Sequence, residues 1–222
     1  MSGKKGGEGM AKGYWFLNLD VVNPVDFITY RDANLDYAQR HHTPFLVRGG
    51  DFEQMEGIKR HRNVLVEFPS FEAAVAAHSS PEYAPIAKLR GSTAICDLAA
   101  VEGFDGPQPS PAPPKPVAGR PLGYWMVRID VSDPERYKDY AAAVAEPFAA
   151  YGAWFVVRGG RNALLEGKGR QRYVVLAFTD VETARACYFS LGYQRALAIR
   201  KEAAEADFVI ISGFTGRETF SA

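Results

Sequence analysis

Apolar and polar side chains alternate along two stretches of the chain, YWFLNLDV at 14–21 and YWMVRIDV at 124–131. Successive side chains on a β-strand point to opposite faces, and both stretches are rich in residues that favour strands. Each is therefore predicted to be a strand with one strongly apolar face, which we expect to lie beneath helices. The residues of that face are Trp15, Leu17, Leu19 and Val21 in the first stretch and Trp125, Val127, Ile129 and Val131 in the second.

A segment with helical features follows each of these strands. Asn-Pro at 23–24 and Asp-Pro at 133–134 each offer an N-cap followed by a proline at the first helical position. Pro147 is expected to bend or end the second of these helices. Farther along, Ser70 and Asp180 can each cap another helix. Two helices are thus predicted in each half of the chain.

Three more runs rich in strand-forming residues complete each half. FLVRGG at 45–50 and RNVLVEF at 62–68 are predicted to be strands joined as a hairpin, and AICDLAAVEGF at 94–104 is predicted to be the last strand. The second half repeats them as FVVRGG, RYVVLAF and ADFVIISGF. The order strand, helix, strand, strand, helix, strand is that of the ferredoxin-like plan, an antiparallel sheet with both helices on one face. The predicted fold class is α+β.

The two halves align at a constant offset and without a gap. Roughly a third of the aligned positions are identical, which indicates a tandem duplication. The chain therefore divides into a disordered tail at 1–12, a first repeat at 13–104, a proline-rich linker at 105–121 and a second repeat at 122–217. Matched pairs include Tyr30 and Tyr140, Arg48 and Arg158, Glu56 and Glu166, Arg62 and Arg172, and Arg90 and Arg200.

Composition and charge narrow the set of partners. The 222 residues are 47% hydrophobic, enough for a sizeable core, and 26 basic residues balance 26 acidic ones. A chain without net charge lacks the electrostatic footprint of nucleic-acid binders, and no apolar run reaches the ~20 residues that cross a bilayer. We expect a cytoplasmic protein with neither a nucleic-acid nor a membrane partner.

The ordered motifs YW, DV, RGG, EG and a final G, present twice, with Asn-Pro or Asp-Pro after DV, resemble those of a bacterial family known as domain of unknown function thirteen-thirty. That family belongs to the dimeric α/β-barrel superfamily, in which a single copy forms the barrel by homodimerising. The resemblance implies that the repeats form an intramolecular pseudo-dimer, which leaves room for further homodimerisation. Superfamily members include lactone isomerases, cofactor-free monooxygenases, heme enzymes and regulatory ligand-binding domains.

A sheet with helices on one face must cover its other face, so we expect the repeats to pack sheet against sheet as an intramolecular barrel. The enclosed space is predicted to bind a small-molecule ligand. The candidate substrate-binding residues are Tyr14, Asn18, Arg48 and Tyr83 from the first repeat, and Tyr124, Arg128, Arg158, Tyr188 and Tyr193 from the second.

Two interpretations remain open for the arginines of the RGG motifs. Arg48 and Arg158 either pair with Glu56 and Glu166, which would hold the bent strands, or bind a substrate carboxylate or enolate. The paired glycines mark a bulge or a sharp bend in either case.

Glu67 and His78 are the candidate catalytic residues. Glu67 either pairs with Arg128 or acts as a general base, and His78 either packs in the core or shuttles protons. Tyr188 occupies the place of His78 in the second repeat.

The predicted function is that of a cofactor-independent enzyme, with isomerase- or lyase-type proton transfer on a small aromatic or enolisable metabolite. The alternatives are a binding or sensing module and an assembly domain whose barrel interior is filled. No metal or cofactor is expected, because the histidines lack metal-site spacing and no nucleotide-binding motif is present.

Overall fold

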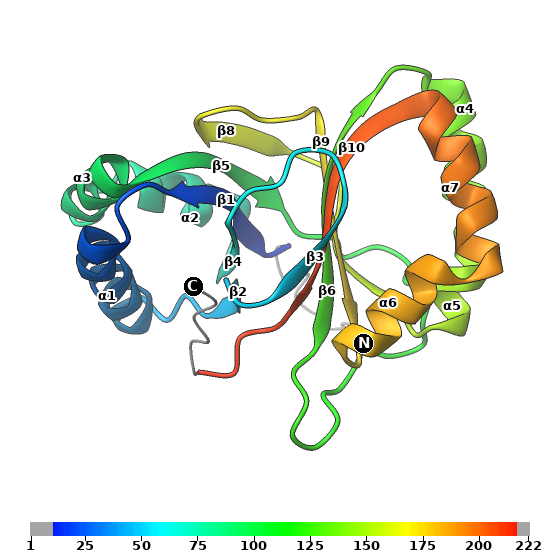
Figure 1. The fold of residues 1–222 in the computed structure, drawn as a ribbon, viewed down its shortest axis with the longest axis horizontal. Coiled ribbons are helices and arrows are strands. Elements are labelled where there is room, and N and C mark those ends of the chain that lie inside the picture. The colour runs from blue at the N-terminus through cyan, green and yellow to red at the C-terminus, as the bar shows by residue number, and fades with distance from the viewer. Residues whose placement is uncertain (1–10, 217–222) are drawn as a thin grey trace, which may run out of the picture.

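The computed structural model describes residues 11–216, so the predicted disordered tail at 1–12 lies almost entirely outside the described residues. Two antiparallel sheets face each other at the centre of the molecule, and helices cover the outer side of each sheet (Figure 1). This is the predicted sheet-to-sheet arrangement of two α+β repeats. None of the helices in the described part is both long enough and apolar enough to cross a membrane.

The first repeat follows the predicted order, with one additional strand and with its last helical segment divided in two. Its strands are β1 (Gly13–Val21), β2 (Phe45–Arg48), β3 (Phe52–Glu56), β4 (Arg62–Phe68) and β5 (Ala94–Glu102). Its helices are α1 (Pro24–Arg40), α2 (Phe71–His78) and α3 (Ala84–Thr93).

The second repeat has the same order of elements. Its strands are β6 (Gly123–Val131), β7 (Trp154–Arg158), β8 (Asn162–Glu166), β9 (Arg172–Phe178) and β10 (Ala204–Ser212). Its helices are α4 (Pro134–Ala143), α5 (Ala145–Ala150), α6 (Val181–Phe189) and α7 (Leu191–Ala203). The long helix α1 thus corresponds to two helices here, and the break falls just before Pro147, as predicted.

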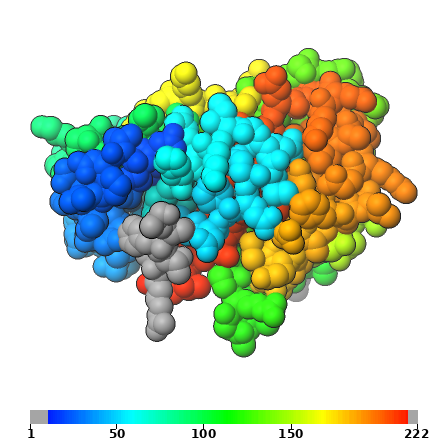
Figure 2. Space-filling model, in the orientation of Figure 1, coloured from blue at the N-terminus to red at the C-terminus, as the bar shows by residue number. Residues whose placement is uncertain are grey.

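Each sheet contains one strand from the other repeat. The strand orders are β2-β4-β1-β5-β8 and β3-β10-β6-β9-β7. Figure 2 shows the cyan segment that contains β3 lying across the middle of the molecule, against the orange part of the second repeat. The predicted hairpin is therefore wrong in one respect: β2 and β4 do pair, but the segment between them forms β3 and joins the other sheet.

The strand faces predicted to lie beneath helices do so. Trp15 and Trp125 are almost fully buried in the two helix-covered cores. Their indole N–H groups donate to backbone carbonyls of the helices above, at 2.7 Å to Ala74 and 3.0 Å to Ala184. Each tryptophan therefore fixes a helix on its sheet as well as filling the core. Asn23 and Asp133 cap α1 and α4, as predicted.

The space between the two sheets is packed with side chains, so the predicted ligand cavity there is wrong. A core of buried residues from both repeats fills it, and it includes Tyr14, Phe16, Leu65, Tyr124, Met126 and Tyr173. A void beside Asn18 and Arg128 measures about 10 Å³, which is room for about one water molecule. This interior matches the filled barrel that was expected of an assembly domain.

The connection between β5 and β6 forms neither helix nor strand. The side chain of Gln108 in this connection exchanges hydrogen bonds with the backbone N–H and carbonyl of Phe155. The boundaries assigned to the repeats and the linker remain predictions.

Candidate functional site

A buried arginine lies between the helices and the sheet of each repeat, paired with a glutamate of the other repeat. Arg90 on α3 donates to Glu166, which β8 brings from the second repeat. Arg200 on α7 donates to Glu56, which β3 brings from the first. Both arginine side chains are about 1% exposed or less. Because an uncompensated buried charge is costly, the strand exchange and the buried arginines stabilise each other.

Two tyrosines accompany each of these arginines. Tyr30 and Tyr83 lie beside Arg90, whose guanidinium is 5.6 and 5.7 Å from their ring centroids. Tyr140 lies beside Arg200 in the same way, at 5.8 Å, and Tyr193 lines the same cavity as both. Burial raises the pKa of Tyr140 to about 12 and lifts the pKa of Tyr193 well above its usual range, although Arg200 opposes both shifts. These hydroxyls therefore remain protonated at neutral pH.

The second repeat has a cavity between its helices and its sheet. Its volume is about 50 Å³, room for roughly three to five water molecules. The polar residues that line it are Tyr137, Tyr140, Arg158, Arg172, Tyr193 and Arg200. The remaining lining is apolar and includes Trp125, Phe148, Phe155 and Phe208. Among the described residues that line the cavity there are three guanidinium groups and no carboxylate.

Two donor atoms that belong to these lining arginines have no hydrogen-bond partner among the described residues. They are Nη1 of Arg200 and Nε of Arg172, both buried from solvent. One other nitrogen of each group is engaged: Arg200 Nη2 donates to Glu56, and Arg172 Nη2 donates to the carbonyl of Arg158 at 3.2 Å. Because buried donors are normally paired, the cavity is suited to an acceptor, above all an anionic one.

Arg158 also reaches the cavity, on the helix side of the sheet. Its guanidinium lies over the rings of Phe155 and Phe104, 4.5 and 5.3 Å from their centroids. A register shift between Phe155 and Val157 in the pairing with β9 places Arg158 on the same face as Phe155. The prediction that Arg48 and Arg158 face the space between the sheets is therefore wrong. The shift is a β-bulge, which reverses the alternation of faces beyond it.

The glycines of the RGG motif fit this interpretation. Gly49 and Gly159 have φ near +72°, a conformation that favours glycine. A Cβ atom at either position would lie within 2.6 Å of the side chain of Arg62 or Arg172. Gly49 therefore leaves room for the side chain of Arg62 against the bent strand. Gly159 does the same for Arg172, which lines the cavity.

In place of the predicted ion pairs, Arg48 and the two glutamates contact other groups. Arg48 donates to the backbone carbonyl of Arg31 at 2.8 Å and lies over the ring of Phe45. Glu56 and Glu166 pair instead with the buried arginines of the opposite repeat. Strand exchange carries each glutamate away from the bend that precedes it, which removes the predicted pairing.

Glu67 and His78 do not share a site. Glu67 accepts from the hydroxyl of Tyr14 at 3.2 Å and pairs with Lys12 at 3.3 Å, on the sheet face that meets the other sheet. His78 lies on the helix-covered face, where its Nε2 is 2.6 Å from Glu166. The predicted pairing of Glu67 with Arg128 is also wrong. Neither Glu67 nor His78 lines the cavity of the second repeat.

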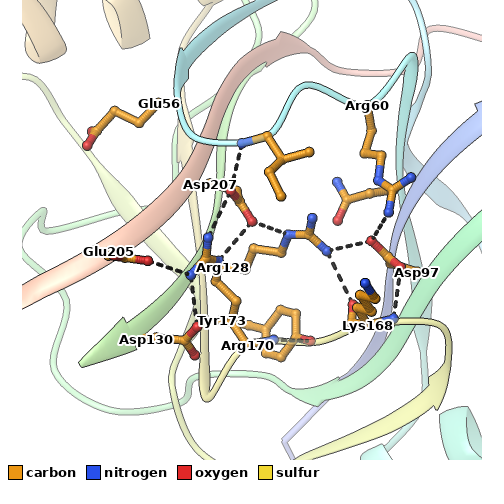
Figure 3. Close-up of polar contacts among 12 residues, drawn as sticks. Glu56, Arg60, Asp97, Arg128, Asp130, Lys168, Arg170, Tyr173, Glu205 and Asp207 are labelled. Carbon is orange, nitrogen blue, oxygen red and sulfur yellow. Dashed lines mark hydrogen bonds and ion pairs between the residues drawn. The ribbon is translucent and has the colours of Figure 1, made fainter. Parts of the chain in front are cut away.

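Arg128 is part of a buried ion network between the two sheets (Figure 3). It donates to Asp207 at 2.8 Å and to Asp97 at 3.0 Å. Arg170 and Arg60 extend the network to these two carboxylates, each at 2.8 Å. The network joins residues of both repeats, and it assigns Arg128 to the interface rather than to a ligand.

The remaining candidates are distributed between the two interiors. Asn18 donates to Asn63 at 2.7 Å between the sheets, where Tyr124 is also buried. Tyr83 and Tyr188 lie beneath the helices, and the Tyr188 hydroxyl is 3.4 Å from Glu56. Of the candidates, Arg158 and Tyr193 line the cavity.

Sequence reasoning missed several residues of this site. Tyr140, Arg172 and Arg200 line the cavity, and Glu56 holds Arg200 from outside. All four belong to pairs that are identical in the two repeats. That identity was the available signal, but identity alone gives no position in space.

The lining residues bear on metals and cofactors as well. The described residues include no group of three or more His, Cys, Asp and Glu placed to hold a metal ion. A cavity of about 50 Å³ is also too small for a heme. The site as built fits a small molecule.

Two solved structures illustrate the fold. A proposed monooxygenase from Fusobacterium nucleatum subsp. nucleatum ATCC 25586 has a TM-score of 0.56 at 12% identity, over 92% of this chain and 93% of that one. An anthrone oxidase-like protein has a TM-score of 0.50 at 10% identity, over 97% of each chain. At these identities the likeness concerns the fold alone.

No curated protein matches the chain in sequence. The model of one family, described as "Domain of unknown function (DUF1330)", matches twice, at residues 12–104 and 122–214. The two matches coincide with the two repeats and together cover most of the chain. The protein therefore belongs to this family, as a tandem pair of its domains.

Proposed function

We propose that the protein binds a small carboxylate or enolate in the helix–sheet cavity of its second repeat. The observation that carries this proposal is the unpaired Nη1 of Arg200, a buried donor that belongs to a residue lining an otherwise largely apolar cavity. A ligand oxygen there would complete the hydrogen bonds of Arg200. Arg172 Nε offers a second donor, so an oxyanion with two oxygens suits the site.

The size and lining of the cavity limit the ligand further. A volume of about 50 Å³ limits the ligand to a short acid or enolate of a few non-hydrogen atoms. The rings of Trp125, Phe148 and Phe208 favour an apolar or unsaturated carbon skeleton on the ligand. The predicted small enolisable metabolite fits this description better than a large aromatic one.

The tyrosine pair supports a second candidate function, cofactor-independent proton transfer of the isomerase or lyase type. Tyr140 is protonated at neutral pH and lies beside Arg200. It would donate its proton to a carbon of a bound enolate: the O–H bond breaks, a C–H bond forms, and water reprotonates the tyrosinate. The guanidinium groups would stabilise the enolate before this step. Tyr140 would thus take the place predicted for Glu67 and His78.

Ligand binding is tested by an NMR titration of nitrogen-15-labelled protein with propionate. Saturable shifts are expected for the Nε–H signal of Arg172 and the indole signal of Trp125. Propionamide, of equal size but uncharged, is the matched control and should shift them far less. If propionate produces no saturable shift, the proposed function is wrong.

The enzymatic candidate needs a separate measurement. Run in reverse, the same step lets the tyrosinate of Tyr140 take a proton from the methyl group of pyruvate, so in deuterated water it would speed the exchange of the methyl protons, which NMR can follow. Tyr140→Phe should abolish this exchange while leaving pyruvate affinity nearly unchanged. Exchange that is no faster than in buffer would leave binding as the function of the site.

A further inference from the structure

We infer that Glu56 of the first repeat is a positioning residue for the ligand site of the second repeat. The inference rests on the proposed function and deepens it, because it makes the site a joint product of both repeats.

The end of β3 is fixed against the second repeat. Glu56 lies opposite Phe208 in the pairing with β10. Gly57 follows with φ +74°, and a Cβ atom there would lie 2.2 Å from Oδ1 of Asp207. The N–H of Ile58 donates to this same oxygen at 2.8 Å. The Glu-Gly pair therefore ends the strand at a defined place, which sets the position of the Glu56 carboxylate.

That carboxylate engages one side of the Arg200 guanidinium. Arg200 Nη2 donates to Oε1 of Glu56, while Nη1, on the same planar group, has no partner among the described residues. A guanidinium is rigid, so a hold on one nitrogen determines the direction of the other. Glu56 does not line the cavity and acts through Arg200.

The equivalent contact in the first repeat has no such consequence. The Glu166 carboxylate forms ion pairs with both Arg90 and His78. In addition, Arg90 Nη1 donates to the hydroxyl of Tyr83 at 2.6 Å. Both terminal nitrogens of Arg90 are therefore occupied by protein groups. Glu166 thus provides a control at the matching position.

The first repeat supplies a second support. Phe104, just beyond β5, lies beneath the guanidinium of Arg158 at 5.3 Å from its centroid. Two of the three cavity arginines, Arg158 and Arg200, are therefore held by side chains of the other repeat. Such pre-positioned donors bind an anion with less loss of side-chain freedom.

The test compares substitutions at Glu56 by propionate titration and thermal unfolding of the full chain. Glu56→Asp keeps the charge but shortens the side chain, so it should weaken propionate binding about tenfold, the loss of one charge-assisted hydrogen bond. Glu56→Gln keeps an acceptor at the original distance and should stay within about threefold of the unmodified protein. Glu166→Asp should leave propionate binding unchanged.

The pattern separates position from charge and from folding. Normal binding by Glu56→Asp with weak binding by Glu56→Gln would mean that charge alone matters, and would overturn the inference. Unchanged binding in both variants, or tighter binding in Glu56→Asp, would also overturn it. If the unmodified protein does not bind propionate, the proposed function fails as well, whereas binding that is insensitive to Glu56 removes this inference alone.

Discussion

The two repeats place the same elements around the same arginines, yet their helix–sheet spaces differ. In the second repeat the space is a cavity of about 50 Å³, and in the first it shrinks to about 10 Å³. Helix α1 buries Phe27, Tyr30 and Asn34, whereas α4 has no fully buried residue. The two repeats therefore keep the same arrangement of strands and helices, and differences along one helix make their helix–sheet spaces unequal in size.

Two helix positions account for much of this difference. Arg31 and Asn34 line the small space in the first repeat, and the shorter Ala141 and Val144 take their places in the second. Asn34 also lies 3.4 Å from the Tyr30 hydroxyl. In this chain the helix that covers the sheet thus determines how large the helix–sheet space is, while the barrel interior stays filled in both repeats.

The largest expected effect concerns Arg128, which has Asn18 as its counterpart in the first repeat. Arg128→Asn would remove the cation that joins two buried carboxylates, so the free energy of unfolding should fall by about 3 kcal/mol. Urea unfolding measures this loss. Asn18→Ala is the control and should cost about 1 kcal/mol, the value of one hydrogen bond. Equal losses in both variants would contradict the role of Arg128 at the interface.

The next prediction exchanges the residues at two helix positions that line the helix–sheet spaces of the two repeats. Ala141→Arg combined with Val144→Asn gives the second repeat the residues of the first, and should weaken propionate binding by at least about tenfold because the cavity is filled. The reverse pair, Arg31→Ala and Asn34→Val, leaves the second repeat intact and should preserve that binding. Propionate affinity that survives the first pair would locate the ligand elsewhere.

A smaller effect is expected at His78, whose counterpart is Tyr188. His78→Phe removes the contact with Glu166 but leaves Arg90 paired, so the loss of unfolding free energy should be about 1 kcal/mol. Propionate binding, measured by the same titration, should not change. A loss of binding would return His78 to the ligand site, where it was first predicted.

Mild acid should have the smallest effect on the free energy of unfolding. Burial alone would raise the pKa of Asp97, but the N–H of Lys168 and the guanidinium groups of Arg128 and Arg60 outweigh it and hold that pKa below its usual range. This stabilisation is fully present above pH ~4, the ordinary pKa of an aspartate, and is lost as the pH falls through the lowered value.

Urea unfolding at several pH values checks this prediction. Stability should stay nearly constant from neutral pH to about pH 5 and fall below about pH 4. Arg128→Asn should make this decline smaller and end it at a higher pH, because the carboxylate loses one of its cations and its pKa in the folded protein moves back toward the ordinary value. An unchanged acid profile in that variant would indicate that Arg128 does not set the pKa of Asp97.

The sequence by itself determined the duplication, the order of most elements and the helix-covered faces. Alternation along 14–21 placed Trp15 in the core because side chains on a strand must alternate, and Pro147 broke a helix because proline lacks an N–H. It also supplied the repeated pairs, such as Arg90 and Arg200, without their location. These are local properties, which each short segment carries with it.

Only the tertiary structure decided where the candidate ligand site lies. The segment 52–56 became a strand by pairing with β10, and a bulge moved Arg158 to the helix side. Edge pairing depends on which strand is available as a neighbour, and a bulge depends on the register with that neighbour. Both are contacts between segments far apart in the chain, so alternation within one segment could not reveal them.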